Sequence, residues 1–297
     1  MTTYKNLIFS SGSIRGLSYI GCLQALDERG ILDGITTYVG VSAGSMISLL
    51  LYLEYTYEEI RELVLGLDFN MLKNISGEHI LEYFSRFGID DGRKMRRLIE
   101  ICIEKKGHNK DITFGEAYEH YGKTLIVIGC CLNDQSKEIF SHEYKPDVSI
   151  ADAIMISISI PFYYTMRELG KKQYVDGAII DTYPIDMFRD QLDVTIGFLI
   201  SCGDTYHRDT VNSIDAYAFS VYYSMSKQLE GLYLRLYGKH TIKLVVNLGL
   251  LQFKLSRDEK EDIFNIGYRE TNRFFHRKKL KEVCDAIKTR DKSDDKK

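Results

Sequence analysis

A serine between two glycines is the first place in this sequence where residue type and spacing indicate chemistry. Residues 40–44 read Gly-Val-Ser-Ala-Gly and lie between an apolar strand-like run and an apolar helix-like run. A Gly-x-Ser-x-Gly turn between a strand and a helix is typical of a nucleophile elbow, in which Gly40 and Gly44 leave room for an exposed Ser42. The helix N-terminus behind the serine favours negative charge. Taken alone, the short pattern also fits a serine that only caps a helix.

Two further segments supply groups that such a serine would need. Residues 11–16 read Ser-Gly-Ser-Ile-Arg-Gly before the first predicted helix, and small residues there let backbone amides approach an anion. The same turn is a poor dinucleotide-binding loop, because two of that motif's three glycines and its acidic residue are missing. Residues 174–178 read Tyr-Val-Asp-Gly-Ala. By itself this Asp-Gly pair is most simply a hairpin turn.

Composition limits the class of protein. The chain has 297 residues, of which 44% are hydrophobic, and a net charge of −3 at pH 7. It is long enough for a large core, and its charge balance gives no support to a nucleic-acid partner. The six cysteines form neither a Cys-x-x-Cys pair nor a disulfide framework, which favours a reducing compartment. The histidines lack metal-ligand spacing, so we expect no metal and no other cofactor.

The N-terminal segment and the apolar runs bear on location. Residues 1–6 are polar and are followed by only three apolar residues, so no secretory signal is predicted. The apolar run at 46–53 is interrupted and far shorter than the roughly 20 residues that a membrane helix needs. We therefore expect an intracellular, cytoplasmic protein with no integral membrane span, which can bind peripherally at membranes.

Hydrophobic spacing predicts the elements that must hold the three segments in place. Strands are expected over 6–10, 36–41, 125–132, 195–201 and 241–248. Helices are expected over 15–29, 43–54, 150–159, 217–236 and 256–275. Two strands joined by a helix at the start indicate a βαβ unit and a largely parallel sheet. Residues 56–109 are mostly helical and are expected to form a cap near the site.

The order of the three motifs resembles the patatin-like phospholipases. That order is a small-residue turn ending in Arg-Gly, then Gly-x-Ser-x-Gly, then Asp-Gly-Ala. Other segments also resemble this family: Gly-Ile-Asp-Asp-Gly at 88–92, Ile-Thr-Phe-Gly-Glu at 112–116 and Ser-Ile-Ser-Ile-Pro-Phe at 157–162. The resemblance covers residues 5–280, for which it implies a single patatin-like α/β domain. Its central, mostly parallel sheet would be flanked by helices on both faces, and residues 281–297 would be a charged, flexible tail.

The resemblance also implies a Ser-Asp dyad. Matched position by position, Ser42 is the nucleophile and Asp176 is the general base. The backbone amides of Gly12 and Ser13 match the oxyanion hole of the family, and Arg15 matches the basic residue of the same turn.

Three small residues complete the matched motifs, and the first turn departs from the family. Gly16 closes the first motif, and Gly177 and Ala178 follow the aspartate. Where the family usually has three glycines, this chain has Ser-Gly-Ser at 11–13. A positive φ costs a serine energy that a glycine avoids.

The implied activity is that of a lipid acyl hydrolase of the phospholipase A or lysophospholipase type. It would cleave fatty acyl esters of a lipid or membrane-surface substrate through an acyl-enzyme. One alternative is a catalytically impaired lipid-binding protein of the same fold, which the serines of the first turn support. Another is an α/β-hydrolase esterase with a Ser-Asp-His triad, whose histidine would be His207, His240 or His276.

Overall fold

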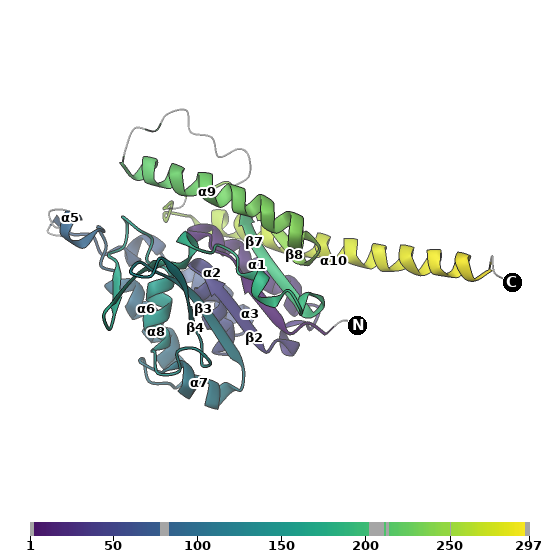
Figure 1. The fold of residues 1–297 in the computed structure, drawn as a ribbon, viewed down its shortest axis with the longest axis horizontal. Coiled ribbons are helices and arrows are strands. Elements are labelled where there is room, and N and C mark those ends of the chain that lie inside the picture. Colours follow the sequence, from purple (N-terminus) through teal and green to yellow (C-terminus); the bar gives the residue numbers. More distant parts are fainter. Residues whose placement is uncertain (1–2, 78–82, 202–210, 212–213, 250, 295–297) are drawn as a thin grey trace.

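A central sheet organises the chain (Figure 1), whose computed structural model describes residues 3–77, 83–201, 211, 214–249 and 251–294. The sheet has eight strands in the order β5-β6-β3-β2-β1-β7-β8, and β4 pairs with β3. The strands are β1 Asn6–Phe9, β2 Thr37–Val41, β3 Thr124–Cys131, β4 Ser136–Phe140, β5 Arg167–Leu169, β6 Lys172–Asp176, β7 Thr195–Ser201 and β8 Thr241–Val245.

The middle of the sheet is parallel, as the sequence predicts. Strands β3, β2, β1, β7 and β8 run in the same direction. Strands β4 and β6 run antiparallel to β3, and β5 runs antiparallel to β6. Strands β1 and β7 are buried along their whole length, which matches their continuous apolar sequences and requires helices on both faces.

Two buried clusters lie on the two faces of this sheet. Leu7 and Phe9 of β1 belong to the larger cluster and Ile8 to the smaller one, because successive residues of a strand point to opposite faces. The larger cluster includes residues of α1 and α2, and α9 contributes to the smaller cluster. The helices are α1 Ser18–Asp27, α2 Ala43–Tyr52, α3 Tyr57–Gly66, α5 Tyr83–Arg86, α6 Arg93–Lys105, α7 Phe114–Tyr121, α8 Ile150–Ser157, α9 Ile214–Tyr237 and α10 Arg257–Asp294.

Helices α1 and α10 touch backbone to backbone. A Cβ atom on Gly21 would lie 1.8 Å from the carbonyl oxygen of Phe264, and one on Gly267 would lie 1.8 Å from that of Ser18. Only glycine permits this approach at either position, so the crossing fixes α1 against the last helix. Helix α1 directly follows the short 3₁₀ helix η1 (Ser13–Leu17).

The segment expected to form a cap contains α3, the 3₁₀ helix η3 (Phe69–Leu72), α5 and α6. Helix α3 begins with a capping box between Thr56 and Glu59. At its other end the Lys260 ammonium of α10 donates to the carbonyl oxygens of Val64, Leu65 and Leu67. Since these are the carbonyls that a helix end leaves unpaired, Lys260 attaches the segment to α10.

The end of the chain differs from the expectation for its last residues. The sequence predicts a last helix that ends at residue 275, and the family resemblance implies a charged, flexible tail over residues 281–297. In the structure α10 continues to Asp294. The physical reason is that lysine, glutamate, leucine and alanine all have high helix propensity, so charge alone does not end a helix.

Candidate active site

The serine of the Gly-x-Ser-x-Gly motif occupies the tight turn between β2 and α2. Its backbone has φ 52° and ψ −122°, a conformation that is costly for any residue except glycine. A Cβ atom on Gly40 would lie 2.4 Å from the carbonyl oxygen of Gly44, and one on Gly44 would lie 2.2 Å from that of Phe9. Both glycines are therefore needed for the turn to pack against β1 and α2. The segment has the local geometry of a nucleophile elbow.

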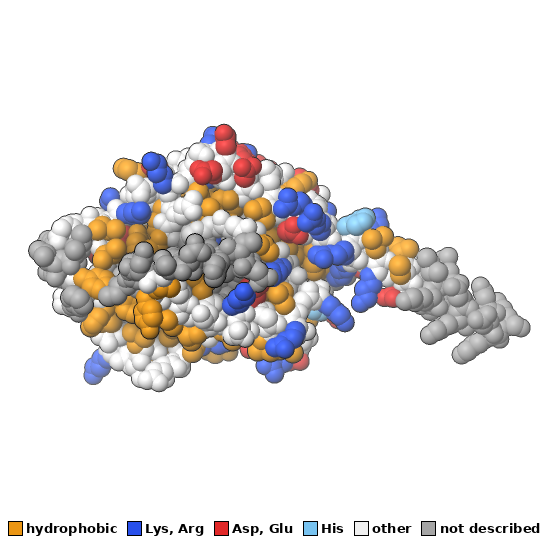
Figure 2. Space-filling view, turned by 90° about the horizontal axis from the view of Figure 1, so that it is seen from above, with side chains coloured by type: hydrophobic (Ala, Val, Ile, Leu, Met, Phe, Trp, Pro, Cys, Tyr) orange, Lys and Arg blue, Asp and Glu red, His pale blue; other side chains and the backbone are white. Residues whose placement is uncertain are grey.

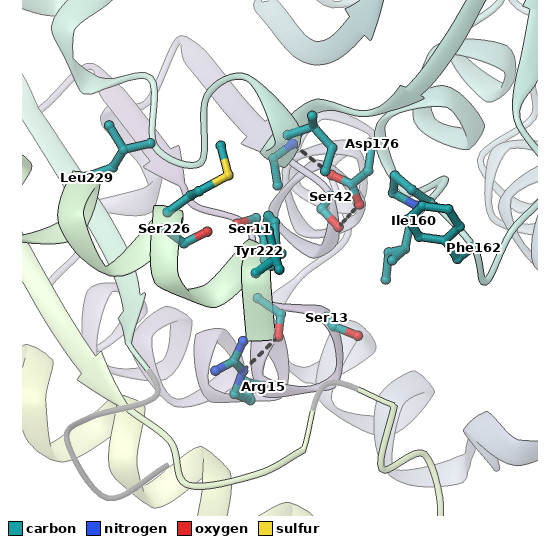
Figure 3. A pocket seen from close by; sticks show the side chains of 16 residues that line it. Ser11, Ser13, Arg15, Ser42, Ile160, Phe162, Asp176, Tyr222, Ser226 and Leu229 are labelled. Atoms are coloured by element: carbon teal, nitrogen blue, oxygen red, sulfur yellow. Dashed lines mark hydrogen bonds between the residues drawn. The ribbon is translucent and has the colours of Figure 1, made fainter. Parts of the chain in front are cut away.

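The side chains of Ser42 and Asp176 meet at this turn (Figure 3). Ser42 Oγ donates a hydrogen bond of 2.7 Å to Asp176 Oδ2, across 134 positions of sequence. Both residues are almost fully buried, with 5% of Ser42 and 3% of Asp176 exposed. The two side chains are hydrogen-bonded directly, with no third side chain linking them.

The register of β3 explains why the two residues meet. On one edge of β3, Ile128 pairs with Val41, the last residue of β2, and Gly129 pairs with Asp176, the last residue of β6. On the other edge, the same two residues of β3 pair with β4. Strands β2 and β6 therefore lie end to end along one edge of β3 and run toward each other. The chain leaves both strands at the same point, which brings Ser42 to the aspartate.

The Asp176 carboxylate is held by backbone as well as by the serine. Its Oδ1 accepts a hydrogen bond of 2.8 Å from the amide of Ala178. A Cβ atom on Gly177 would lie 2.2 Å from the carbonyl oxygen of Ile128, so only glycine lets the turn pack on β3. Burial raises the pKa of Asp176 from 3.8 to about 7, although the hydrogen bonds from Ser42 and Ala178 act to lower it. A carboxyl group with this pKa is suited to exchange protons near neutral pH.

The small-residue turn after β1 lines the cavity that lies in front of Ser42. Gly12 and Ser13 both line it, and Ser13 has a positive φ of 50°. The Arg15 side chain, only 5% exposed, donates from Nε to the carbonyl oxygen of Gly12 at 3.2 Å and lies over the ring of Tyr223. Figure 3 shows this hydrogen bond, through which Arg15 holds the turn in place.

Gly16 brings the turn close to the elbow. A Cβ atom on Gly16 would lie 2.9 Å from the Cβ of Ala43, the residue after the serine. The structure thus brings the elbow, the Asp-Gly-Ala turn and the small-residue turn to one place.

The cavity in front of Ser42 has a volume of about 230 Å³. It lies between α9 and the turns that carry Ser42 and Asp176. Its walls are largely apolar and include Ile160, Phe162, Ala178, Ile179, Tyr222 and Met225. Several of these side chains also reach the surface: Phe162 is 54% exposed and Met225 is 60% exposed. Figure 2, which views the α9 side, shows hydrophobic side chains gathered on this face.

Two serines at the end of α8 hold Ser42 and Asp176 in place and were not singled out from the sequence. Ser157 Oγ accepts a hydrogen bond of 2.9 Å from the amide of Ser42, and the carbonyl oxygen of Ser159 accepts one of 2.9 Å from the amide of Asp176. The Arg167 Nε donates to Ser159 Oγ at 3.1 Å. A signal was present in the sequence, since Ser-Ile-Ser-Ile-Pro places two polar residues at the end of an apolar helix.

The histidines considered for a triad do not lie beside Asp176 where they are described. His240 precedes β8 and lies near the N-terminal ends of the parallel strands, whereas Ser42 follows the C-terminal end of β2. His276 lies on α10 in a groove with Tyr268 and Arg277, and His207 lies outside the described residues. Within the described ranges, no histidine lines the Ser42 cavity, and no group of acidic, histidine or cysteine side chains could hold a metal ion. No helix in the same ranges is long and apolar enough to cross a bilayer.

Several known proteins are similar to this chain in sequence or in fold. A family model described as patatin-like phospholipase matches residues 7–189. The chain is 30% identical over 277 residues to an uncharacterized protein of Acanthamoeba polyphaga mimivirus. That alignment covers 89% of this chain and 91% of the viral protein. It is 29% identical over 184 residues to a probable lipid hydrolase of Invertebrate iridescent virus 6, covering 62% and 63%.

Among solved structures, VipD from Legionella pneumophila has a similar fold. The TM-score is 0.63 with 18% sequence identity, over 92% of this chain and 66% of VipD. The chain thus spans just under two thirds of VipD and of the iridescent virus protein.

Proposed function

This chain belongs to the patatin-like phospholipase family, a family of lipid hydrolases, and from that premise we propose that it cleaves fatty acyl esters by the joint action of Ser42 and Asp176. The reaction type would be that of a phospholipase A or lysophospholipase, a carboxylic-ester hydrolase. The observation that carries the proposal is the direct hydrogen bond of 2.7 Å between Ser42 Oγ and Asp176 Oδ2.

The proposed reaction begins with attack of Ser42 Oγ on the ester carbonyl carbon. The serine proton passes to Asp176 Oδ2, and a tetrahedral intermediate forms. Backbone amides of Gly12 and Ser13 would stabilise its oxyanion, while Arg15 keeps the turn in place through the Gly12 carbonyl. Each such donor is typically worth about 10²–10³ in rate.

The intermediate then collapses, and Asp176 returns the proton to the departing alcohol oxygen. The acyl group stays on Ser42 as an ester. A water molecule attacks this acyl-enzyme, gives its proton to Asp176 and releases the fatty acid, after which Ser42 regains its proton. Burial supports the role of the aspartate, because a pKa of about 7 makes it a far better base than an exposed carboxylate.

The lining of the cavity supports a lipid substrate. Its wall is mainly apolar, and the exposed Phe162 and Met225 extend the apolar surface around the opening. Apolar side chains around a catalytic opening allow contact with a lipid surface. We place the protein inside the cell, acting peripherally at membranes, and the free thiols of the five described cysteines are consistent with this.

The assignment of catalytic units follows the same proposal. Residues 5–280 would form the catalytic domain, residues 56–109 its cap, and residues 281–297 an appendage that takes no part in the reaction.

A second candidate function is that of a catalytically impaired protein of the same fold, which binds lipid without hydrolysing it. The observation that favours it is the positive φ of Ser13, which stands where the family has glycine. A serine in this conformation is less stable than a glycine, and a shifted turn would misplace an oxyanion donor.

The deciding experiment presents the purified protein with mixed phospholipids and identifies released products by mass spectrometry. The wild-type protein should release free fatty acids, and the Ser42→Ala variant should release none above background. A fluorophosphonate probe should label Ser42 in the wild type. A folded wild-type protein that releases no fatty acid and takes no label would refute the hydrolase and favour the lipid-binding candidate.

A further inference from the structure

A second cavity opens on the other side of Ser42. Its volume is about 140 Å³, and residues of α2, α3, η3 and α6 contribute to its wall. Ser13, Ser42 and Ile160 line both cavities. The serine therefore lies where the two cavities meet, with one under α9 and the other under the cap segment.

Both cavities have largely apolar walls, but the first has more polar side chains than the second. The first is lined in part by Ser11, Arg15 and Ser226. Among the described residues that line the second cavity, Tyr164 is the one polar side chain besides the two serines shared with the first, and the others are aliphatic, aromatic, methionine or glycine. A wall of this kind offers few hydrogen-bonding groups to a polar ligand, so it suits a hydrocarbon chain.

One face of α2 gives the second cavity its length. Ala43, Met46, Ile47 and Leu50 all line it, at the spacing that places residues on one face of a helix. The stripe begins next to Ser42, and the seven steps from Ala43 to Leu50, at a rise of about 1.5 Å each, make it about 10 Å long. An extended chain advances about 1.2 Å per bond, since a residue of three bonds spans about 3.5 Å. About eight carbons of an extended hydrocarbon chain therefore fit along the stripe.

We propose that this second cavity, the acyl chamber, holds the acyl chain of the ester that Ser42 attacks, and that Met46 determines the preferred chain length. The polar remainder of the lipid would lie in the first cavity, beside Ser11, Arg15 and Ser226. Met46 stands halfway along the stripe and is only partly buried, as expected for a side chain that borders open space. The inference rests on the proposed function, because it assigns the chain of the ester that function cleaves.

The test compares p-nitrophenyl esters with 4 to 16 carbons in wild type and Met46→Trp. A tryptophan at Met46 would fill the middle of the acyl chamber and exclude several methylene groups. Each buried methylene contributes about fourfold to binding. The ratio of kcat/KM for the 12-carbon ester to that for the 4-carbon ester should therefore fall at least tenfold. Met46→Ala enlarges the chamber and should move the preferred length toward longer chains.

Two matched variants separate this effect from other effects of a new tryptophan. Met71→Trp changes a methionine of η3 that is 66% exposed and lies outside the lining of the chamber, so it should leave the ratio at the wild-type value. Met225→Trp fills the first cavity. A fall in the ratio for Met225→Trp as large as that for Met46→Trp, or equal losses at all chain lengths for Met46→Trp, would overturn the proposal.

Binding of dodecanoate keeps the inference testable independently of catalysis. Calorimetry on Ser42→Ala should show binding of dodecanoate, and adding Met46→Trp should weaken it at least tenfold. A wild-type protein that hydrolyses no ester would refute the proposed function, whereas this binding difference would still support the chamber. Hydrolysis with an unchanged chain-length ratio, or equal dodecanoate affinity in both variants, would refute the chamber alone.

Discussion

Replacing Asp176 by asparagine should lower kcat by about 10²–10⁴ and at the same time stabilise the folded protein at neutral and alkaline pH. The carboxyl is 3% exposed, and its pKa is raised from 3.8 to about 7 because burial penalises the charged form. Asparagine keeps the shape of the side chain and can still accept from the Ala178 amide. It carries no charge that must be buried, but it cannot act as a base.

The pH dependence of this stabilisation follows from linkage. A pKa higher in the folded than in the unfolded state means that the proton stabilises the folded protein. This stability is fully present below pH 4 and is lost as the pH rises to about 7. The total loss of stability corresponds to about 4 kcal/mol, and more than half of it occurs between about pH 5 and about pH 8.5. With about 2.1 cal/mol/K of unfolding entropy per residue, 4 kcal/mol corresponds to a Tm change of about 6 °C.

The assay combines thermal unfolding between about pH 5 and about pH 8.5 with ester hydrolysis at pH 8. The Tm of Asp176→Asn minus that of the wild type should increase with pH, while kcat falls by about 10²–10⁴. Asp147→Asn, at an exposed aspartate, controls for the loss of one carboxylate from the surface. An Asp176→Asn variant that is no more stable than the wild type at pH 8, or whose advantage does not depend on pH, would refute the reasoning about burial. Hydrolysis at the wild-type rate would refute the role of Asp176 as the base.

Three further predictions concern the same site. The kcat/KM of the wild type should rise with pH through an apparent pKa near 7, because Asp176, the proposed base, accepts a proton only in its ionised form. A profile that stays flat from about pH 5 to about pH 9 would contradict this assignment. Gly177→Ala should lower kcat/KM by about 10² or more, since its Cβ would lie 2.2 Å from the Ile128 carbonyl oxygen and displace the aspartate. Gly231→Ala on α9, where nothing lies within 4 Å of an added Cβ, should keep the wild-type rate. Ser13→Gly should raise the free energy of unfolding by about 0.5–1 kcal/mol in urea titrations, because glycine relieves the positive φ. Ser13→Ala should give no such gain, and equal values for the two variants would show that this turn is not strained.

Much of the fold could be predicted from the sequence because its strong signals are local. Apolar runs identify the buried strands, and the glycines of the elbow fit a turn in which added Cβ atoms would meet backbone. The last helix was expected to begin at residue 256, and both hydrogen bonds of a capping box between Ser256 and Glu259 form there.

The meeting of Ser42 and Asp176 could not be derived from local signals. It depends on the register in which β2 and β6 share one edge of β3, and pairing between distant strands leaves no local trace. Without the family resemblance, the sequence would predict only a hairpin turn at the Asp-Gly pair. The role of Ser157 was hidden for the same reason, because its hydrogen bond to the Ser42 amide joins residues 115 positions apart.

The backbone contact between α1 and α10 has a consequence for when the site can form during synthesis. Gly21 packs on the carbonyl of Phe264, and Gly267 packs on that of Ser18, one residue after the 3₁₀ helix that begins at Ser13. Ser42 and Asp176 are both translated long before residue 267, yet the turn beside them lacks this support until α10 has left the ribosome. Domains generally fold as units during synthesis. A nascent chain should therefore carry both side chains of the proposed dyad before the turn at residues 11–16 is fixed, and the proposed hydrolysis should begin only after the last helix has been translated.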